Sequence, residues 1–385
     1  MLIHITPSYK PAYIYGGTTA SVSKLCECLT EYGCDLIVLT TTANGDQDLK
    51  VAADKINLVD GVMVMYCKRI LKDPFHLSIS LLSQLYRLTR NNPSVIVHIH
   101  SWWNLTAIFS LLLTRLMNIT TVLSTRGMIT DYTFANKNSW LKILFHHFLG
   151  KHLLKYPHIH ATGIKEQKDI LQNIKAHKIF ILPNLIHFPR ISLTGRLTKE
   201  YASPHHRTVF KLLFLSRIQK KKGLELLFKA LKDFPYPWQL TIAGTGTHTY
   251  MQYLQAMCVK LKICDSIIWT GQIPNESKYE IMAGADILVL PSYNENFGNV
   301  VLESLLSGTA VIVSECVGLS DYIRRNKLGW VMQPSISSLT QNLILAYTQS
   351  GKRNYIRKTA PGKVRRDFDQ HELTKQYIQY YSEIV

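Results

Sequence analysis

Short runs of β-branched and aliphatic residues alternate with amphipathic segments along the first half of the chain. Segments such as Thr18–Tyr32 and Ile79–Leu88 have apolar residues at helical spacing, and each lies between two of the apolar runs. Parallel strands joined by crossover helices produce this alternation. The pattern predicts strands near residues 2–6, 36–40, 62–67, 95–99, 120–124, 158–162 and 178–182.

A second series of the same kind begins at Lys211 and predicts strands there and near residues 238–242, 266–270, 286–290 and 310–313. Residues 188–208 have mixed polarity, two prolines and no sustained period, so we expect an interdomain linker there. The predicted fold is therefore α/β, with two Rossmann-like, doubly wound parallel-sheet domains, residues 1–187 and 209–365, facing across a cleft. Residues 366–385 should form a helix that packs back on the first domain.

Length and composition agree with a packed two-domain protein. A chain of 385 residues is longer than one hydrophobic core usually supports, and 46% of its residues are hydrophobic. The N-terminus has no basic leader, and no apolar run approaches the roughly 18 residues that span a bilayer. Seven cysteines without a paired Cys-x-x-Cys spacing favour neither disulfides nor a structural zinc. We therefore expect a cytoplasmic protein, soluble or peripheral to the membrane.

The net charge of +18 suits nucleic acid, an anionic membrane surface or phosphorylated substrates. Basic runs with regularly interleaved aromatic residues, which typify single-strand nucleic-acid grooves, do not occur, so nucleic acid is not expected as a partner. Residues 140–155 combine lysines and histidines with large apolar residues. Such a basic amphipathic helix can lie in an anionic membrane interface, although a crossover helix with one buried face has the same pattern.

The residues after the apolar strand at 286–290 form a polar loop that leads into a helix. The loop places Glu295 at the carboxyl end of the strand, and Glu303 falls in the first turns of the helix that opens near Gly298. Backbone amides at Phe297, Gly298 and Asn299 would suit phosphate oxygens, and the two carboxylates would suit sugar hydroxyls. Equally, Glu303 could merely complement the helix dipole and Glu295 could be a solvated loop residue.

The context Glu-x-Phe-Gly-x-x-x-x-Glu around Glu295 and Glu303 resembles the signature of glycosyltransferase family four, which comprises retaining nucleotide-sugar enzymes of GT-B fold. The resemblance implies that Glu295 contacts the hydroxyls of the transferred sugar and that Glu303 holds the ribose. Amides from Asn296 to Asn299 would then meet the sugar or the diphosphate.

The start of the second domain, Phe214-Leu-Ser-Arg-Ile-Gln-Lys-Lys-Lys-Gly, resembles the same family and implies that Arg217 and Lys222 bind the diphosphate. Fixed cations stabilise a departing diphosphate, so no metal or other cofactor is expected. An exposed basic turn before a helix is the alternative for these residues. The family-like loops Ile242-Ala-Gly-Thr-Gly and Trp269-Thr-Gly-Gln-Ile-Pro would bring further residues to the nucleotide, namely Gly244, Gly271, Gln272 and Ile273.

In the first domain, Gly16 and Gly17 precede a helix and could bring amides close to a phosphate. By the resemblance, His100 at its strand end approaches the transferred sugar. His98 shares its strand face, which would also suit a metal pair, although a core histidine is the alternative.

The acceptor side of the prediction uses three further residues. Trp102 and Trp103 could offer an apolar platform to a lipid acceptor, or one or both could belong to the core. Arg126 lies in Ser-Thr-Arg-Gly-Met, which resembles a Ser-Pro-Arg-Gly-Met loop of bacterial members, and it could face the acceptor or form a structural ion pair. Leu185 replaces the glycine of the family's interdomain Pro-Asn-Gly element.

The resemblance covers nearly the whole chain and implies an enzyme, a hexosyltransferase. The expected reaction is retaining transfer of galactose, glucose or an N-acetylhexosamine from a nucleotide-diphosphate sugar, most simply a UDP-sugar, to a lipid-linked saccharide or glycolipid on the cytosolic face of the membrane. Asp46-Gln-Asp48 and Asp367-Phe-Asp369 have the Asp-x-Asp form of metal-dependent transferases, but their positions favour surface residues. A GT-B nucleotide-sugar epimerase or hydrolase and a basic nucleic-acid-binding protein are the rival functions.

Overall fold

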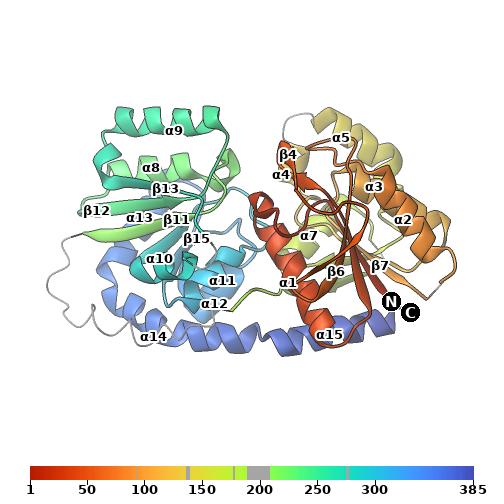
Figure 1. Cartoon of the computed structure of the whole chain (residues 1–385). Coiled ribbons are helices and arrows are strands. Elements are labelled where there is room, and N and C mark those ends of the chain that lie inside the picture. Colours follow the sequence, from red (N-terminus) through yellow and green to blue (C-terminus); the bar gives the residue numbers. More distant parts are fainter. Residues whose placement is uncertain (93, 136–138, 177, 189–208, 275–276) are drawn as a thin grey trace. The chain divides into compact units, whose positions relative to one another are not determined.

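The computed structural model describes the whole chain except residues 93, 136–138, 177, 189–208 and 275–276. It consists of two compact units (Figure 1). The first contains Met1–Ile186 together with Phe368–Val385, and the second contains His187–Asp367. Most of the linker predicted from the sequence, residues 189–208, lies outside the described residues.

The first unit is built on a sheet of eight strands in the order β10-β9-β8-β7-β1-β2-β6-β5. Neighbouring strands pair in parallel, except that β5 runs antiparallel to β6. The central strands are largely aliphatic and buried along their whole length, as expected for a parallel sheet covered on both faces. In sheet order the strands are Ile179–Ile181, His158–Ala161, Thr121–Ser124, Ile96–His100, Leu2–Thr6, Leu36–Thr41, Val62–Cys67 and Ile56–Val59.

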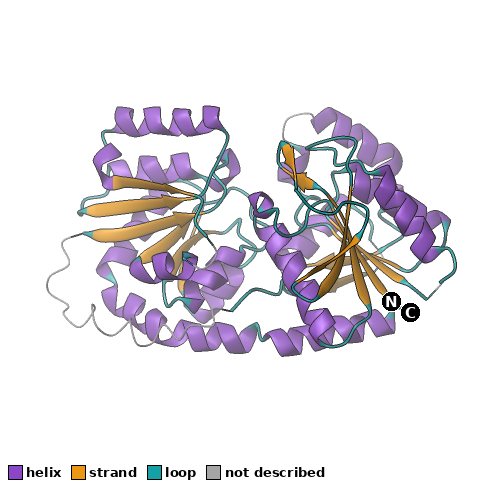
Figure 2. Ribbon diagram, viewed as in Figure 1, coloured by secondary structure: helices purple, strands orange, loops and turns teal. Residues whose placement is uncertain are grey.

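Helices cover both faces of this sheet (Figure 2). Side chains cap several of them: Ser78 Oγ accepts from Leu81 N at 3.2 Å, and Asn104 Oδ1 accepts from Ala107 N at 2.8 Å. The helices are α1 (Gly17–Glu31), α2 (Ile79–Thr89), α3 (Leu105–Leu116), α4 (Asp131–Phe134), α5 (Ser139–Phe145), the π-helix η2 (His146–Gly150), α6 (Lys151–Leu153), α7 (Ile164–Asn173) and α15 (Gln370–Glu383), and the 3-10 turn η1 spans Tyr13–Tyr15.

The second unit has a six-stranded, wholly parallel sheet in the order β13-β12-β11-β14-β15-β16. Its strands are Ile267–Gly271, Trp238–Ala243, Phe210–Leu215, Ile287–Leu290, Ala310–Ser314 and Gly329–Met332 in that order. The helices around it are α8 (Leu224–Lys232), α9 (His248–Leu261), α10 (Lys278–Gly284), α11 (Asn299–Leu306), α12 (Ser320–Asn326), α13 (Ile336–Thr348) and α14 (Ser350–Asp367), and Figure 2 shows them on both faces. The predicted α/β class with two doubly wound sheets is confirmed.

The structure differs from the sequence prediction at several elements, including a short two-stranded sheet of β3 (Ala43–Asn44) and β4 (Gln47–Asp48). Strands β5 and β16 were not predicted, because β5 is largely exposed and β16 begins with a glycine. The helix predicted over residues 366–385 is shorter in the structure: α15 spans Gln370–Glu383 within the first unit, and α14 ends at Asp367. Asp369 lies between them and caps α15, since its Oδ1 accepts from Glu372 N at 3.0 Å.

The length and hydropathy of the helices determine whether any of them could span a membrane. Among the described residues, every helix is too short or too polar to cross a lipid bilayer.

Candidate functional site

The second unit brings the two most informative sequence motifs together where β11 and β14 end. These strands are neighbours in the sheet, so the segments that follow them meet at one edge. Gly223 lies so close to Pro291 that a Cβ there would come within 2.2 Å of the Pro291 carbonyl oxygen, and Tyr293 N donates to Lys221 O at 2.8 Å. At this junction Lys222 Nζ donates to Glu295 Oε2 in an ion pair, with the two side chains 10% and 20% exposed.

Three cations surround the Glu295 carboxylate. Burial by itself raises the pKa of Glu295, but Lys222, Lys221 and Arg217 outweigh it and hold that pKa below its ordinary value. Burial and the neighbouring Lys222 lower the pKa of Lys221 to about 8. The cluster thus keeps a surplus of positive charge after Glu295 is neutralised, which suits a multiply charged anion.

The loop that carries Glu295 is fixed by its backbone. Glu295 N donates to Cys316 O at 3.2 Å, Gly318 N donates to Glu295 O at 3.0 Å, and Leu319 N donates to Phe297 O at 3.2 Å. Gly298 then forms the N-cap of α11, so the positive end of that helix follows directly after Glu295.

Glu303 lies in the second turn of α11 and makes an ion pair that the sequence did not predict. Lys278 Nζ, at the start of α10, is 2.8 Å from Glu303 Oε1, and these side chains are 14% and 13% exposed. Lys278 could not be singled out from the sequence, because a lysine opening a short amphipathic helix is commonplace. The ribose-binding role of Glu303 stays a prediction.

The predicted nucleotide loops also meet at this edge of the sheet. Gly244 N donates to Gly271 O at 2.7 Å, and a Cβ on Gly244 would lie 1.9 Å from the Ser216 carbonyl oxygen, next to Arg217. Gly244 has φ +139°, a conformation that glycine alone adopts without strain. Gln272 is exposed and Ile273 is partly buried, both directly after β13.

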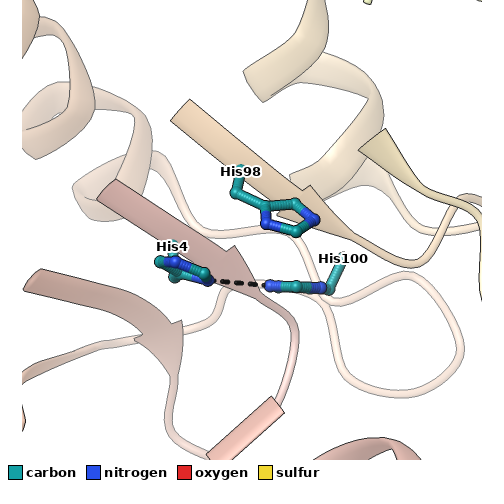
Figure 3. Close-up of side chains that lie close together, drawn as sticks. All are labelled: His4, His98 and His100. Carbon is teal, nitrogen blue, oxygen red and sulfur yellow. Dashed lines mark hydrogen bonds between the residues drawn. The ribbon is translucent and has the colours of Figure 1, made fainter. Parts of the chain in front are cut away.

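In the first unit, His100 is fully buried in a cluster with His4 and His98 (Figure 3). His4 Nδ1 and His100 Nε2 are 3.0 Å apart, and Arg126 Nη2 lies 3.2 Å from His100 Nδ1. Burial, with neighbouring His98 and Arg126, holds the pKa of His100 well below its usual range, and burial with Arg126 lowers the pKa of His4 to about 3. These imidazoles are therefore neutral at physiological pH.

Ligand nitrogens of His4, His98 and His100 all lie within 4.8 Å of one another, as a metal site would require. Their hydrogen bonds do not suit a cation, however. Both nitrogens of His98 lie 2.7 Å from a hydroxyl, those of Tyr381 and Ser124, and the Arg126 guanidinium occupies His100 Nδ1. An arginine beside the cluster also repels a metal ion, so we describe it as a hydrogen-bonded histidine cluster.

A hydrogen-bond chain links this cluster to the C-terminal helix. The Leu182 carbonyl can only accept, so His160 Nε2 carries the proton of that 2.8 Å bond, and His160 Nδ1 accepts from Ser124 Oγ at 2.7 Å. Ser124 Oγ then accepts from His98 Nε2, and Tyr381 donates to His98 Nδ1. The chain thus fixes α15 against β7, β8 and β9.

Gly16, Gly17 and Arg126, also predicted as site residues, follow the carboxyl ends of β1 and β8 in the sheet of the first unit. Gly16 caps α1 and Gly17 is its first residue. Arg126 reaches Ser21 Oγ on α1 at 3.4 Å and also contacts Asn184 Oδ1.

The acceptor platform must be corrected. Trp102 is fully buried in the core, so its ring offers no surface to a ligand and this assignment was wrong. Trp103 is partly buried, and its Nε1 donates to Met128 O at 2.6 Å.

Comparisons with known proteins cover both units. The family model described as Glycosyltransferase Family 4 matches residues 15–188, and the model described as Glycosyl transferases group 1 matches residues 198–363. A D-inositol 3-phosphate glycosyltransferase of Pseudarthrobacter chlorophenolicus is 23% identical over 85% of this chain and 81% of its own length. An uncharacterized glycosyltransferase of Methanocaldococcus jannaschii is 28% identical, and that match spans 44% of each chain, less than half of the relative's length.

Solved structures share the fold along the whole chain. Sucrose-phosphate synthase from Thermosynechococcus elongatus has a TM-score of 0.78 at 17% identity, covering 100% of this chain and 98% of that one. Anabaena HepE, solved in complex with UDP-glucose, has a TM-score of 0.73 at 16% identity, with 99% of both chains covered. WaaG, a glycosyltransferase involved in lipopolysaccharide biosynthesis, has a TM-score of 0.70 at 17% identity, with 98% of both chains covered.

Proposed function

Because this chain belongs to glycosyltransferase family 4 and has the GT-B fold, we propose that it transfers a hexose from a UDP-sugar, with retention, to a lipid-linked saccharide or glycolipid. The product would serve cell-surface polysaccharide or glycolipid synthesis.

The observation that carries the proposal is the ion pair of Lys222 with Glu295 beside Arg217 and Lys221. When a glycosidic bond to UDP breaks, negative charge grows on the leaving diphosphate. Lys222, Lys221 and Arg217 would stabilise that charge without a metal ion. Glu295, released from part of its pairing by the diphosphate, would accept hydrogen bonds from the sugar hydroxyls.

A nucleotide-sugar donor is further supported by the neighbour HepE, which was solved with UDP-glucose. We assign the ribose to Glu303, the base to Gly271, Gln272 and Ile273, and the diphosphate also to Gly16, Gly17 and Gly244. Glucose, galactose and an N-acetylhexosamine are the candidate sugars. His100 is as fully buried as Trp102, so it would contact the transferred sugar where a sugar hydroxyl takes the place of a protein partner of its ring. We infer front-face displacement, in which the leaving diphosphate helps to deprotonate the acceptor hydroxyl.

The lipid character of the acceptor is supported by an exposed apolar stripe, residues 140–149, along α5 and η2. Its large exposed side chains are Trp140, Ile143, Leu144, Phe148 and Leu149. Lys142, Lys151 and Lys155 lie on or directly after the same helical segment, so it offers apolar contact and positive charge together. We propose that this segment rests on an anionic cytosolic membrane surface, where a lipid-linked acceptor is available. The neighbour WaaG acts in lipopolysaccharide biosynthesis, which agrees with such an acceptor.

The experiment that tests the donor is a thermal-shift panel of nucleotides and nucleotide sugars on the full chain, followed by turnover assays with the stabilising donor. UDP-sugars should raise the Tm more than the matched GDP- or ADP-sugars. Turnover should need a glycolipid or lipid-linked acceptor, with the anomeric configuration retained in the product by NMR. Conversion of the donor sugar in the absence of any acceptor would instead indicate an epimerase or hydrolase and would overturn the proposal.

A further inference from the structure

Arg126 is held in an unusual turn by a buried carboxylate, that of Glu166. Arg126 has φ +54° and Gly127 has φ +69°, so the turn is left-handed at two successive residues. Glu166, on α7, is 1% exposed. Its Oε1 accepts from Thr125 Oγ1 at 2.8 Å and from Gly127 N at 2.7 Å, one on each side of Arg126. A non-glycine residue keeps this conformation only where its surroundings enforce it.

The other carboxylate oxygen anchors Glu166 itself. Oε2 accepts from Thr162 N and from Thr162 Oγ1, both at 2.8 Å. Glu166 thus receives four hydrogen bonds and joins the loop after β8 to the start of α7. The direction in which Arg126 projects is set by this arrangement.

The Arg126 guanidinium determines where His100 carries its proton. A guanidinium has no acceptor, so the 3.2 Å contact from Arg126 Nη2 requires an unprotonated His100 Nδ1. A neutral imidazole with a bare Nδ1 has its proton on Nε2. That N–H points to His4 Nδ1 at 3.0 Å, the bond drawn in Figure 3. The tautomer of His100 follows from the donors around it.

We propose that Glu166 and Arg126 are positioning residues that fix His100 as the Nε2–H tautomer, so that His100 serves sugar transfer as a hydrogen-bond donor and not as a proton acceptor. Arg126 occupies the lone pair that a general base would use. The Nε2–H is engaged by His4 Nδ1 in this fully buried cluster, so a sugar hydroxyl oxygen would have to take the place of His4 as its acceptor. The tautomer rests on the geometry alone, whereas its use in transfer rests on the proposed function.

Nitrogen NMR on the full chain tests the tautomer directly. With ¹⁵N-labelled histidine, long-range ¹H–¹⁵N spectra report each ring nitrogen as pyrrole-like or pyridine-like, and the His100→Gln variant identifies the His100 signals by their loss. We expect a pyridine-like Nδ1 and a pyrrole-like Nε2 in the unmodified protein. A pyrrole-like Nδ1 on His100 would overturn the inference whatever the enzyme's activity.

Two variants test the positioning role. Arg126→Met should leave His100 exchanging between tautomers. Glu166→Gln should shift the His100 signals in the same direction, because the new amide NH₂ would face N–H and O–H donors whose hydrogen bonds the carboxylate accepts. With a turnover assay in hand, both should lower kcat about tenfold or more with little change in donor KM. Arg115→Met, which removes an exposed arginine on α3, is the control and should leave spectra and turnover unchanged. Unchanged His100 signals in folded Arg126→Met would contradict the inference, while absence of turnover with every donor would contradict only the proposed function.

Discussion

Lys222 Nζ and Glu295 Oε2 form an ion pair between segments 73 residues apart in the sequence. Gly223, next in sequence to Lys222, packs on the Pro291 carbonyl, so the pair is set by backbone contact at the edge of the sheet. Arg217 and Lys221 add positive charge around the same carboxylate. Positive charge therefore exceeds negative charge at this edge, which favours binding of an anion. A bound diphosphate would rearrange the Lys222–Glu295 pair itself.

Replacing Glu295 should separate catalysis from folding. In Glu295→Gln the carboxylate that would bind the sugar hydroxyls is lost, so kcat/KM should fall at least about hundredfold. The change also removes the anion among three cations, so the Tm without ligand should drop while UDP still raises it. The matched control is Glu372→Gln, which breaks the exposed Lys375–Glu372 pair and should change neither property. Turnover at the unmodified rate in Glu295→Gln would refute the assignment.

Lys221 predicts a pH dependence of nucleotide binding. Its pKa is lowered to about 8, so its positive charge is lost as pH rises through that value. The Kd for UDP should therefore increase by roughly threefold to tenfold between pH 7 and pH 9. Because a folded-state pKa below the unfolded one means that the unfolded chain binds more protons, the unliganded protein should gain stability over the same rise. Calorimetric titration and urea unfolding measure the two opposite trends.

The pH dependence should belong to that one side chain. Lys221→Met should bind UDP more weakly at pH 7 and should lose most of the change between pH 7 and pH 9. Lys220→Met alters the exposed neighbouring lysine and should keep the change in UDP binding between pH 7 and pH 9. An unchanged pH trend in Lys221→Met would assign the effect to another group.

The proposed role of Glu303 predicts that the protein discriminates between UDP and 2′-deoxy-UDP. If its carboxylate holds the ribose hydroxyls, Glu303→Gln should bind UDP and 2′-deoxy-UDP with similar affinity, whereas the unmodified protein should prefer UDP by about tenfold. Lys278→Met removes the cation 2.8 Å from Glu303 Oε1 and should weaken that preference without abolishing it. Competition binding with UDP and 2′-deoxy-UDP measures this preference in each variant. Equal affinity of the unmodified protein for both would show that Glu303 does not read the ribose.

The fold could be predicted from the sequence largely because parallel strands are buried on both faces. Strand Ile287–Leu290 is a continuous apolar run, and Ile96–His100 is aliphatic apart from its two histidines; both were predicted. Strand β5 was missed because Ile56 and Leu58 are 59% and 75% exposed and carry no buried-strand signal. The break between α14 and α15 was missed because Asp369, its capping residue, follows an apolar Phe368 that continues the helical pattern.

The candidate site was predicted unevenly for a physical reason. Glu295, Lys222 and Arg217 lie in local motifs with a recognisable resemblance, so each could be named without knowing its partner. Glu166 and Lys278 could not, because their importance comes from contacts with residues 25 to 41 positions away and not from neighbours in the chain. Trp102 was misassigned because sequence alone does not distinguish a buried tryptophan from an exposed one.

Tyr381 predicts how strongly α15 stabilises the first unit. Tyr381→Phe removes the donor to the buried His98 Nδ1 and should lower the free energy of unfolding by about 1–3 kcal/mol, the usual effect of leaving a buried polar atom unpaired. Tyr380→Phe is the matched control on the same helix, since its hydroxyl lies 2.8 Å from the more exposed His158 and should matter less, by about 1 kcal/mol at most. Urea unfolding followed by circular dichroism measures both. Equal losses in the two variants would contradict the chain through His98.

The exposed apolar stripe predicts binding to anionic membranes. Trp140 and Phe148 are 65% and 71% exposed, and together they would bury large aromatic surface in a membrane interface. Flotation with vesicles should show binding that rises with the fraction of anionic lipid and falls with salt, because the lysines beside the stripe attract the surface through screened charge. The double variant Trp140→Ser with Phe148→Ser should lose about tenfold or more in partition coefficient while turnover with a short, water-soluble acceptor is kept. Tyr355→Ser removes a similarly exposed aromatic residue from α14 and should bind as the unmodified protein does. Equal flotation with neutral and anionic vesicles would exclude this surface as a membrane-binding site.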